Sequence, residues 1–363
     1  MLMVIFGAGA SYDSCPTYPP GYVKAVIGGD PLNNHYRPPL ANELFDNRPM
    51  FAEAIERFPQ CQPIVPRLRS LRGETLEAIL EDLQAKSDFY PRGKQQLAAV
   101  RYYLQFVIRE CERRWRGVQK GVTNYKSLLD EIERTYPQEP VCLVTFNYDT
   151  LLEDALSQFG LSIEAMDDYT NKHAFYKLFK VHGSVNWARE VNGPTKAQNP
   201  EHAWSVVNDL IERAAEIPIT QRYVLTADHP PGVVQLGSVQ DAFLGRVPAR
   251  VTPVFPAIAI PVEKKNAFEC PQDMLADLIS LLPKVSKILA IGWRATEAHF
   301  LALLKTNLRR GPELHIVAGP DAEDIKVRIC RELLNNPPHS PSVDARGFTD
   351  FILTRRAERF LAN

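Results

Sequence analysis

The sequence predicts an α/β fold: a Rossmann-like, mostly parallel sheet with helices on both faces and an inserted helical subdomain. Short apolar runs of strand length end in glycine or polar residues near the beginning, in the middle and near the end of the chain. Helix-like periodicity follows most of these runs. The 363 residues have an ordinary globular composition, and we expect one domain over 1–363.

The expected strands are the apolar runs themselves. They lie at Leu2–Phe6, Val141–Phe146, Tyr176–Gly183, Ser286–Gly292 and Glu313–Gly319. Helices are expected from near Asp149 or Thr150, over "EAHFLALLK" and over "DAEDIKVRICRELL", and the C-terminal "DFILTRRAERFLA" has a helical pattern. Strands that alternate with helices pair in parallel, because each helix returns the chain to the same end of the sheet.

Two stretches interrupt this alternation. Between residues 40 and 136 the periodicity predicts roughly four helices, which form a helical insertion or cap. In "ETLEAILEDLQAKSDF", for example, one face carries Leu76, Ile79, Leu80 and Leu83. Residues 190–256 are expected to form an irregular insert, because polar residues, prolines and glycines punctuate them.

Composition narrows the function classes. The 42 basic and 43 acidic residues nearly cancel, so no direct nucleic-acid partner is expected. The six cysteines are scattered and none forms a CxxC pair, which argues against a zinc ribbon and against a compact disulfide framework. Because no apolar stretch reaches membrane-spanning length, we expect a soluble, cytoplasmic protein without membrane contact.

A glycine-rich turn follows the first strand, in "VIFGAGASYDS". Such a turn lets backbone amides approach a diphosphate closely. The dinucleotide fingerprint has a third glycine where this chain has Tyr12, and the lysine of a P-loop is absent. The alternative is a tight turn without a ligand.

Polar side chains stand where two later strands end. Asn147 can both donate to and accept from a ribose hydroxyl or a positioned water, and Asp149 can accept from an amide. His182, with Gly183 beside it, offers an imidazole that can act as a general base near neutral pH. The alternatives are a helix cap at Asp149, a turn hydrogen bond at Asn147 and a structural histidine. Gly292 ends a fourth strand. Because the carboxyl ends of parallel strands lie at the same end of the sheet, a single crevice there could be lined by all of these residues.

The order of these motifs resembles the sirtuin superfamily. GAGAS, TFNYD, KVHGS and IGW…EAHF follow one another as in that superfamily, between residues 4 and about 320. The stretches "RPPLANELF" and "HGSVNW" are similar to the sirtuin-like (Sir2-like) NAD hydrolases of bacterial anti-phage defence systems. The resemblance implies NAD as ligand and substrate. The family's diphosphate-binding segment matches Gly7, Ala8, Gly9 and Ser11.

The resemblance also implies roles for residues elsewhere in the chain. Asn147 matches the asparagine that contacts the nicotinamide ribose and orients water, and His182 matches the catalytic histidine. Asp149 matches the acid near the nicotinamide amide, and Gly292 the strand-end glycine near the adenosine. Arg37 is a further candidate for contacting the dinucleotide.

The chain departs from the protein deacetylases of the superfamily at one place. Those enzymes carry a four-cysteine zinc module after the catalytic histidine, whereas residues 183–256 contain no cysteine. Water is then the expected acceptor, which predicts an NAD glycohydrolase that releases nicotinamide and ADP-ribose, without a metal. The alternatives are an NAD-dependent protein deacylase and a non-catalytic NAD or ADP-ribose binding module. The resemblance further implies an anti-phage effector gated by homo-oligomer formation or by a partner protein such as a HerA-type ATPase or a short Argonaute module.

Overall fold

The structure, a computed structural model, describes residues 1–20, 35–70, 75–87, 89–135, 139–173, 175–192, 203–226, 233–236, 250–261 and 268–362. The chain divides into two compact units, each with its own sheet. Unit 1 combines Met1–Glu43, Glu110–His182 and Glu263–Asn363, and unit 2 combines Leu44–Arg109 and Gly183–Val262. The expected helical insertion over 40–136 is therefore divided between the two units.

Unit 1 contains a six-stranded sheet in the order β10-β9-β8-β1-β2-β3. All neighbouring strands are parallel. The chain starts in the middle of the sheet, moves outward on one side, and later returns to the other side of β1, which is the strand order of a Rossmann-like fold. The strands are β1 (Leu2–Phe6), β2 (Val141–Thr145), β3 (Tyr176–Lys180), β8 (Lys287–Ile291), β9 (Glu313–Val317) and β10 (His339–Asp344).

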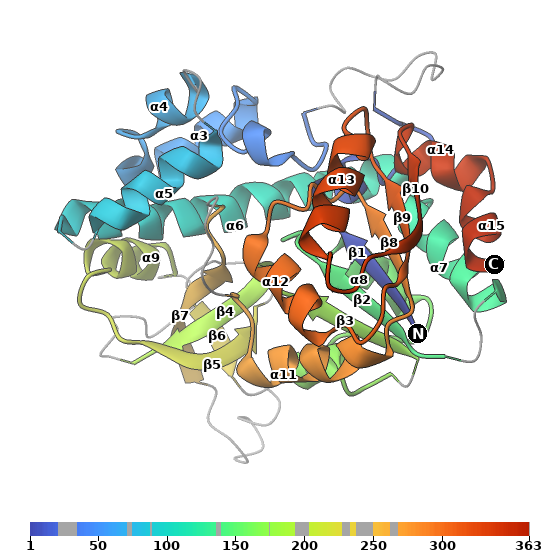
Figure 1. Cartoon of the computed structure of the whole chain (residues 1–363). Helices are drawn as coiled ribbons and strands as arrows, with labels where there is room; N and C mark the ends of the chain where they lie inside the picture. The colour runs from blue at the N-terminus through green and yellow to red at the C-terminus, as the bar shows by residue number, and fades with distance from the viewer. Residues whose placement is uncertain are drawn as a thin grey trace. The chain divides into compact units, whose positions relative to one another are not determined.

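Helices cover both faces of this sheet, as the sequence predicts. Figure 1 shows α7, α14 and α15 on one side of the sheet and α11, α12 and α13 on the other. The helices and 3-10 turns of unit 1 are α1 (Ala8–Tyr12), η1 (Ala41–Glu43), α7 (Asn124–Thr135), α8 (Leu151–Ser157), η3 (Met166–Tyr169), α11 (Gln272–Leu281), η5 (Leu282–Lys284), α12 (Ala298–Asn307), α13 (Ala322–Glu332), α14 (Gly347–Leu353) and α15 (Arg356–Ala362).

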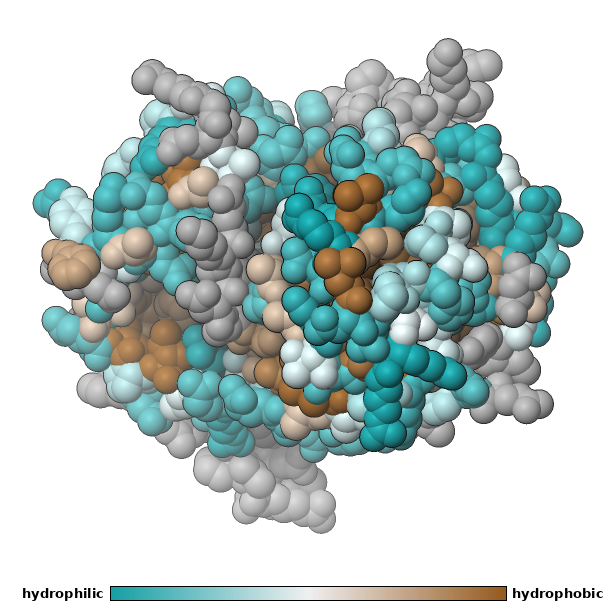
Figure 2. Space-filling model, in the orientation of Figure 1, coloured by the Kyte–Doolittle hydropathy of each residue, from teal (hydrophilic) through white to brown (hydrophobic). Residues whose placement is uncertain are grey.

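The core of unit 1 lies on the central strands. Every residue of β1, β2 and β8 is buried, which is why these segments are continuous apolar runs in the sequence. At the edge, β10 is largely exposed and contains Pro341, which an edge strand tolerates because its N–H is not needed for pairing. On the face shown in Figure 2, hydrophobic residues form small groups separated by hydrophilic ones.

The C-terminal segment with the helical pattern forms two helices, α14 and α15, which are separated at Arg355. Arg355 has a φ of 56°, in the left-handed region that ends a helix. The apolar periodicity continues across this break, so the sequence pattern alone does not reveal it.

Unit 2 contains a four-stranded antiparallel sheet in the order β5-β4-β7-β6. Its strands are β4 (Gly183–Val191), β5 (Ile219–Leu225), β6 (Val233–Leu236) and β7 (Arg250–Ile258). Its helices are α3 (Pro49–Arg57), η2 (Pro59–Cys61), α4 (Val65–Ser70), α5 (Leu76–Ser87) and α9 (Ala203–Glu212), and α6 (Pro91–Gln119) contributes residues to both units.

The prediction that residues 190–256 are irregular is wrong for these strands and for α9. In β7, Pro253 pairs with Val233 and Pro256 pairs with Ala188. Each proline removes only one donor from the ladder, and the β-branched Val254 and the aromatic Phe255 between them favour an extended strand. The prolines of this segment therefore do not prevent a strand.

Candidate active site

Glycines bring the ends of β1 and β8 into direct backbone contact. Gly7 N donates to Ile291 O at 3.0 Å, and Gly9 N donates to Gly292 O at 3.1 Å. Gly292 has a φ of +60°, and a Cβ on it would lie 2.2 Å from Ala10 N. The contact occurs between β1 and β8, where the strand order of the sheet reverses. Open α/β sheets bind ligands at such a reversal, beyond the carboxyl ends of the strands.

Three amides in this turn already have partners. Besides the Gly7 and Gly9 amides, Ala10 N donates to Gly7 O at 2.9 Å. The direct effect of the glycines is therefore the close approach of two strand ends. Binding of a diphosphate by Gly7, Ala8, Gly9 and Ser11 stays a prediction.

Ser11, Tyr125 and Asn147 form a buried hydrogen-bonded group. They come from α1, α7 and the residues that follow β2. Ser11 Oγ lies 2.9 Å from Tyr125 Oη. Asn147 Nδ2 donates to Ser11 Oγ at 2.9 Å and to Tyr125 Oη at 3.3 Å. These contacts fix the plane of the Asn147 amide.

The oxygen of the Asn147 side-chain amide indicates a role beyond packing. Its side chain is 6% exposed, and Oδ1 has no hydrogen-bond partner among the residues that the structure describes. Leaving a buried acceptor unsatisfied costs about 1–3 kcal/mol. An oriented, unsatisfied amide oxygen at a strand end is suited to accept from a ligand hydroxyl or from water.

Asp149 lies between this group and α8. Its Oδ1 accepts from Leu151 N at 3.2 Å, so part of its role is to satisfy an amide at the start of the helix. Burial raises the pKa of Asp149, while the positive charge of Lys180 and a hydrogen bond from Ser11 oppose that change. The Asp149 carboxylate therefore supports the backbone at the start of α8, and its place near a nicotinamide amide stays a prediction.

Lys180 holds the same turn from β3. Its side chain is fully buried, and Nζ pairs with Glu153 Oε1 at 2.8 Å and donates to the carbonyl of Asp149. Burial raises the pKa of Glu153, and the charge of Lys180 lowers it. This ion pair fastens the start of α8 to the end of β3.

Glu112 on α6 supports the turn from a third direction. Its two carboxylate oxygens accept from the backbone amide and the hydroxyl of Thr150, and Arg116 Nη2 donates to Oε1 at 2.7 Å. Burial raises the pKa of Glu112 to about 7. The Asn147–Thr150 turn is therefore held by buried polar side chains from several elements of unit 1.

His182 lies in an aromatic cluster at the neighbouring strand end. Its ring centroid is 4.8 Å from that of Phe146 and 5.9 Å from that of His299. Phe146 in turn stacks on Trp293, with centroids 5.4 Å apart and planes 6° apart. His182 is 3% exposed, so the imidazole is held in a largely dry environment.

Asn147 and His182 occupy equivalent positions on adjacent strands. Thr145 of β2 pairs with Lys180 of β3, and each candidate lies two residues beyond its paired residue. The described contacts of their side chains differ: Asn147 contacts Ser11 and Tyr125, whereas His182 contacts the Phe146 ring. The structure thus joins Ser11, Asn147 and Asp149 in one network and places His182 in the cluster beside it.

Arg37 has protein partners in this structure. Its guanidinium donates to the carbonyls of Tyr12 at 2.6 Å and Tyr18 at 2.9 Å. It also lies 4.8 Å from the centroid of the Trp115 ring. These contacts favour a role in holding the segment after α1, and a contact of Arg37 with a dinucleotide stays a prediction.

Sequence reasoning missed three buried polar residues of the site: Glu112, Tyr125 and Lys180. Glu112 had a detectable signal, since it shares the helix face of Ile108, Cys111 and Trp115, all of which are buried. Lys180 had one too, as a charged residue inside an otherwise apolar strand. Tyr125 had none, because a tyrosine on the buried face of a helix is ordinary.

The described residues lack two further features. They contain no group of three or more His, Cys, Asp or Glu side chains placed to hold a metal ion. Nor does any helix within these residues have the length and apolar character needed to cross a membrane. The six cysteines are unpaired thiols.

Comparison with known protein families gives a match for one part of the chain. Residues 141–223 match the family model of the SIR2-like domain, and this segment includes Asn147, Asp149 and His182. No curated protein matches the sequence.

Among solved structures, the chain is similar to a Sir2 complex with p53 peptide and NAD+, at 15% identity and a TM-score of 0.35, covering 99% of this chain and 92% of that one. It is also similar to a sirtuin in a study of sirtuin substrate affinity, at 14% identity and a TM-score of 0.33, covering 99% and 93%. Because these scores are low, the assignment of the fold rests on the sheet described above.

Proposed function

We propose that this protein hydrolyses the N-glycosidic bond of NAD, releasing nicotinamide and ADP-ribose. The observation that supports this most is the buried, unsatisfied Oδ1 of Asn147, oriented by Ser11 and Tyr125. Asn147 follows β2, and His182 follows the adjacent strand β3. The SIR2-like match over this segment agrees with NAD as the ligand.

The chemistry follows from the charge on NAD. The bond between the ribose C1′ and the nicotinamide nitrogen breaks, and the bonding electrons neutralise the positively charged ring, so the leaving group needs no proton. Positive charge develops on the ribose, as in other glycoside cleavages. Asn147 Oδ1 accepts from a ribose hydroxyl or from the attacking water. His182 takes the proton that water loses, a role that usually contributes about 10²–10⁴-fold.

The dinucleotide lies across the reversal point of the sheet in this proposal. Its diphosphate is near the turn from Gly7 to Ser11, its adenosine is near Gly292, and its nicotinamide amide is near Asp149. The amides of Gly7 and Gly9 already donate to carbonyls at the end of β8. These glycines therefore contribute by letting the two strand ends approach each other closely. Arg37 acts by holding the segment after α1, where it binds the carbonyls of Tyr12 and Tyr18.

Chromatography of NAD and its products over time tests this function. Wild-type protein is expected to release nicotinamide and ADP-ribose in equal amounts, and Asn147→Ala and His182→Ala are each expected to be slower by about 10²-fold or more. Asn307→Ala and His339→Ala are matched controls. These side chains stand at the end of α12 and at the start of β10, and they bond to the carbonyls of Leu303 and Gly311. Equal release by wild type and by the two site variants contradicts the assignment.

The same assay separates the alternatives. A protein deacylase consumes NAD only when an acyl-lysine peptide is present, and then forms an acylated ADP-ribose. A binding module returns NAD intact, although NAD raises its melting temperature. Either result replaces the hydrolase proposal. The absence of cysteine from residues 183–256 favours water over a peptide as the acceptor.

Free NAD hydrolysis harms the cell that makes the enzyme, so we further propose that activity is gated by homo-oligomer formation or by a partner, in an anti-phage defence system. A HerA-type ATPase or a short Argonaute module is the kind of partner expected. Mass measurement and NAD turnover should be followed with and without such a partner. A monomer that is fully active alone contradicts the gating proposal and leaves the hydrolase assignment intact.

A further inference from the structure

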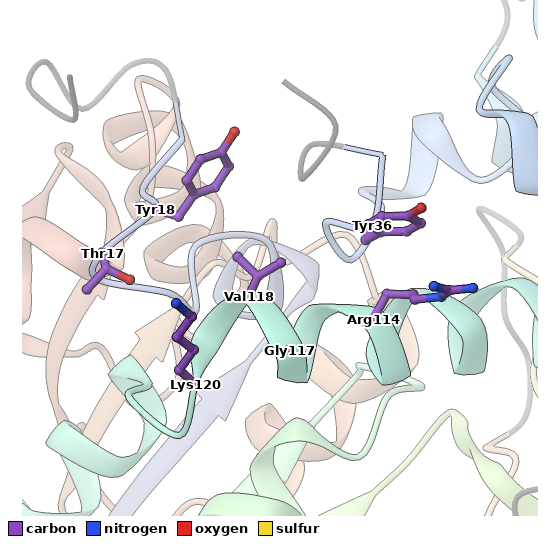
Figure 3. Close-up of a pocket in the computed structure, with 7 residues that line it drawn as sticks. All are labelled: Thr17, Tyr18, Tyr36, Arg114, Gly117, Val118 and Lys120. Atoms are coloured by element: carbon purple, nitrogen blue, oxygen red, sulfur yellow. The ribbon is translucent and has the colours of Figure 1, made fainter. Parts of the chain in front are cut away.

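Unit 1 has a cavity of about 420 Å³ whose lining includes none of Ser11, Tyr125, Asn147 and His182. This volume is within the usual range of small-molecule sites, about 300–1,000 Å³. One side of it is lined by residues before and after Arg37 in the sequence, and the other side by the C-terminal end of α6 and the residue that follows it. The lining residues are Thr17, Tyr18, Tyr36, Arg114, Gly117, Val118 and Lys120, as Figure 3 shows.

Two tyrosines form the aromatic walls of this cavity, and arginines hold both. The carbonyl of Tyr18 accepts from Arg37, whose guanidinium also lies 5.2 Å from the Tyr18 ring centroid. Arg114 lies 5.5 Å from the centroid of the Tyr36 ring. The Tyr18 ring further packs edge-to-face on Trp115, at 6.1 Å between centroids. The walls are thus fixed before any ligand binds.

Gly117 leaves the floor of the cavity open. It lies within α6, where glycine is less favourable than alanine because it adds backbone entropy to the unfolded chain. A Cβ at this position would meet no atom within 4 Å. Packing within the described residues therefore does not require glycine here. A flat ligand lying over the helix would require it, because a side chain at this position would occupy the same space.

The charge of the lining is positive. No acidic side chain is among the lining residues, although Glu110 outside the cavity bonds Arg114 Nε at 2.9 Å. The Lys120 ammonium, at the end of α6, has no ion-pair partner in the part of the chain that the structure describes. Figure 3 shows Lys120 and Thr17 toward one end of the cavity and Tyr36 and Arg114 toward the other.

We propose that this cavity binds a nucleoside phosphate. The aromatic walls and the open floor suit a flat base, since base–aromatic stacking tolerates any base. Lys120 and the Thr17 hydroxyl suit the phosphate, because a lysine ammonium is a compact charge with several donors. No lining residue belongs to the Ser11–Tyr125–Asn147 network or to the His182 cluster, so this site does not depend on the proposed hydrolase function.

Titration of the whole chain with AMP, adenosine and inorganic phosphate, followed by calorimetry, tests the site. Wild type is expected to bind AMP about ten-fold or more tightly than adenosine, because a charge-assisted hydrogen bond is at stake. Gly117→Leu fills the floor and Lys120→Met removes the charge, and each is expected to weaken AMP binding about ten-fold or more. Lys305→Met, at an exposed lysine on α12, is the matched control and is expected to bind as wild type does, whereas Gly117→Ala is expected to weaken AMP binding less than Gly117→Leu does.

Ser11→Ala identifies the site that AMP occupies, because the proposed NAD site holds phosphate beside Ser11. AMP binding that persists in Ser11→Ala and is lost in Gly117→Leu supports the second site. AMP binding that is lost in Ser11→Ala and kept in Gly117→Leu places the nucleotide at the turn after β1 and overturns the proposal. Equal binding of AMP and adenosine, or no AMP binding at millimolar concentration, also overturns it. Melting curves check the fold of Gly117→Leu against Gly117→Ala.

Discussion

The carboxylate of Glu112 accepts a hydrogen bond from the backbone amide of Thr150 at 2.7 Å and another from its hydroxyl at 2.8 Å. One acid from α6 thus satisfies both donors of the residue that precedes α8. Arg116, one helical turn later, neutralises part of its charge. The turn that carries Asn147 and Asp149 therefore depends on a residue more than thirty positions away in the sequence.

The titration of the Glu112 carboxyl is expected to make the stability of the protein depend on pH. Its pKa of about 7 in the folded protein exceeds the ordinary 4.5, so the folded state binds more protons between these values. The stability contribution is full below about pH 4.5 and is lost as the pH rises through about 7. The unfolding free energy of wild type, minus that of Glu112→Gln, should fall by roughly 3 kcal/mol between pH 4.5 and 8. Urea denaturation at several pH values measures this difference, and a constant difference contradicts the prediction.

Removing one partner of the Lys180–Glu153 pair is expected to be more harmful than removing both. Lys180→Met leaves a buried carboxylate without its cation, which costs about 3–5 kcal/mol. The double variant Lys180→Met, Glu153→Leu should recover much of this loss, because two apolar side chains then pack together. Denaturant midpoints of the two variants provide the comparison. If the double variant is less stable than Lys180→Met alone, the pair has a role that burial and charge do not explain.

Two strand-end glycines of unit 1 are expected to respond differently to alanine. Gly292→Ala places a methyl group 2.2 Å from Ala10 N and keeps a left-handed φ, whereas a Cβ on Gly319 meets nothing within 4 Å. The left-handed φ alone costs about 1–2 kcal/mol, and the overlap adds to it. Gly292→Ala should therefore lower the melting temperature strongly or prevent soluble expression, and Gly319→Ala should change it little. Similar melting temperatures for the two variants contradict the close packing of the strand ends.

Tyr125 is expected to affect turnover more than folding. Its hydroxyl contacts Ser11 Oγ and Asn147 Nδ2, so Tyr125→Phe frees the Asn147 amide to rotate. If the protein hydrolyses NAD as proposed, kcat should fall about ten-fold or more, the effect of about 1.4 kcal/mol lost in the transition state. Tyr176→Phe is the control, since the buried Tyr176 hydroxyl donates to the Leu129 carbonyl instead. An unchanged kcat in Tyr125→Phe would mean that the Tyr125 hydroxyl does not position Asn147 for turnover.

The sequence predicted the parallel sheet well because its strands are buried on both faces. An apolar run such as Met3–Phe6 or Cys142–Val144 has no other stable location. The edge strand β10 was missed, because its residues are mostly exposed and polar. The antiparallel strands of unit 2 were also missed where prolines interrupt them, since their pairing depends on partners distant in sequence.

The site was predictable in part for a related reason. Asn147 and His182 follow apolar runs directly, so their place at the sheet edge could be read from neighbouring residues. Glu112 and Tyr125 belong to α6 and α7, and nothing near them in the sequence indicates which strand end they reach. Contacts that join helices to strand ends depend on the packing of the whole unit, which local patterns do not encode.

The backbone contact between the ends of β1 and β8 has a consequence for how the chain is made. One side of this contact is synthesised first, at Gly7 and Gly9, and the other only when Gly292 has left the ribosome. Until then, the central strand β1 lacks its neighbour β8 and exposes an unpaired edge that β8 covers in the finished sheet. If the protein binds NAD as proposed, a nascent or truncated chain that stops before residue 287 lacks this contact and is expected to be inert toward dinucleotides.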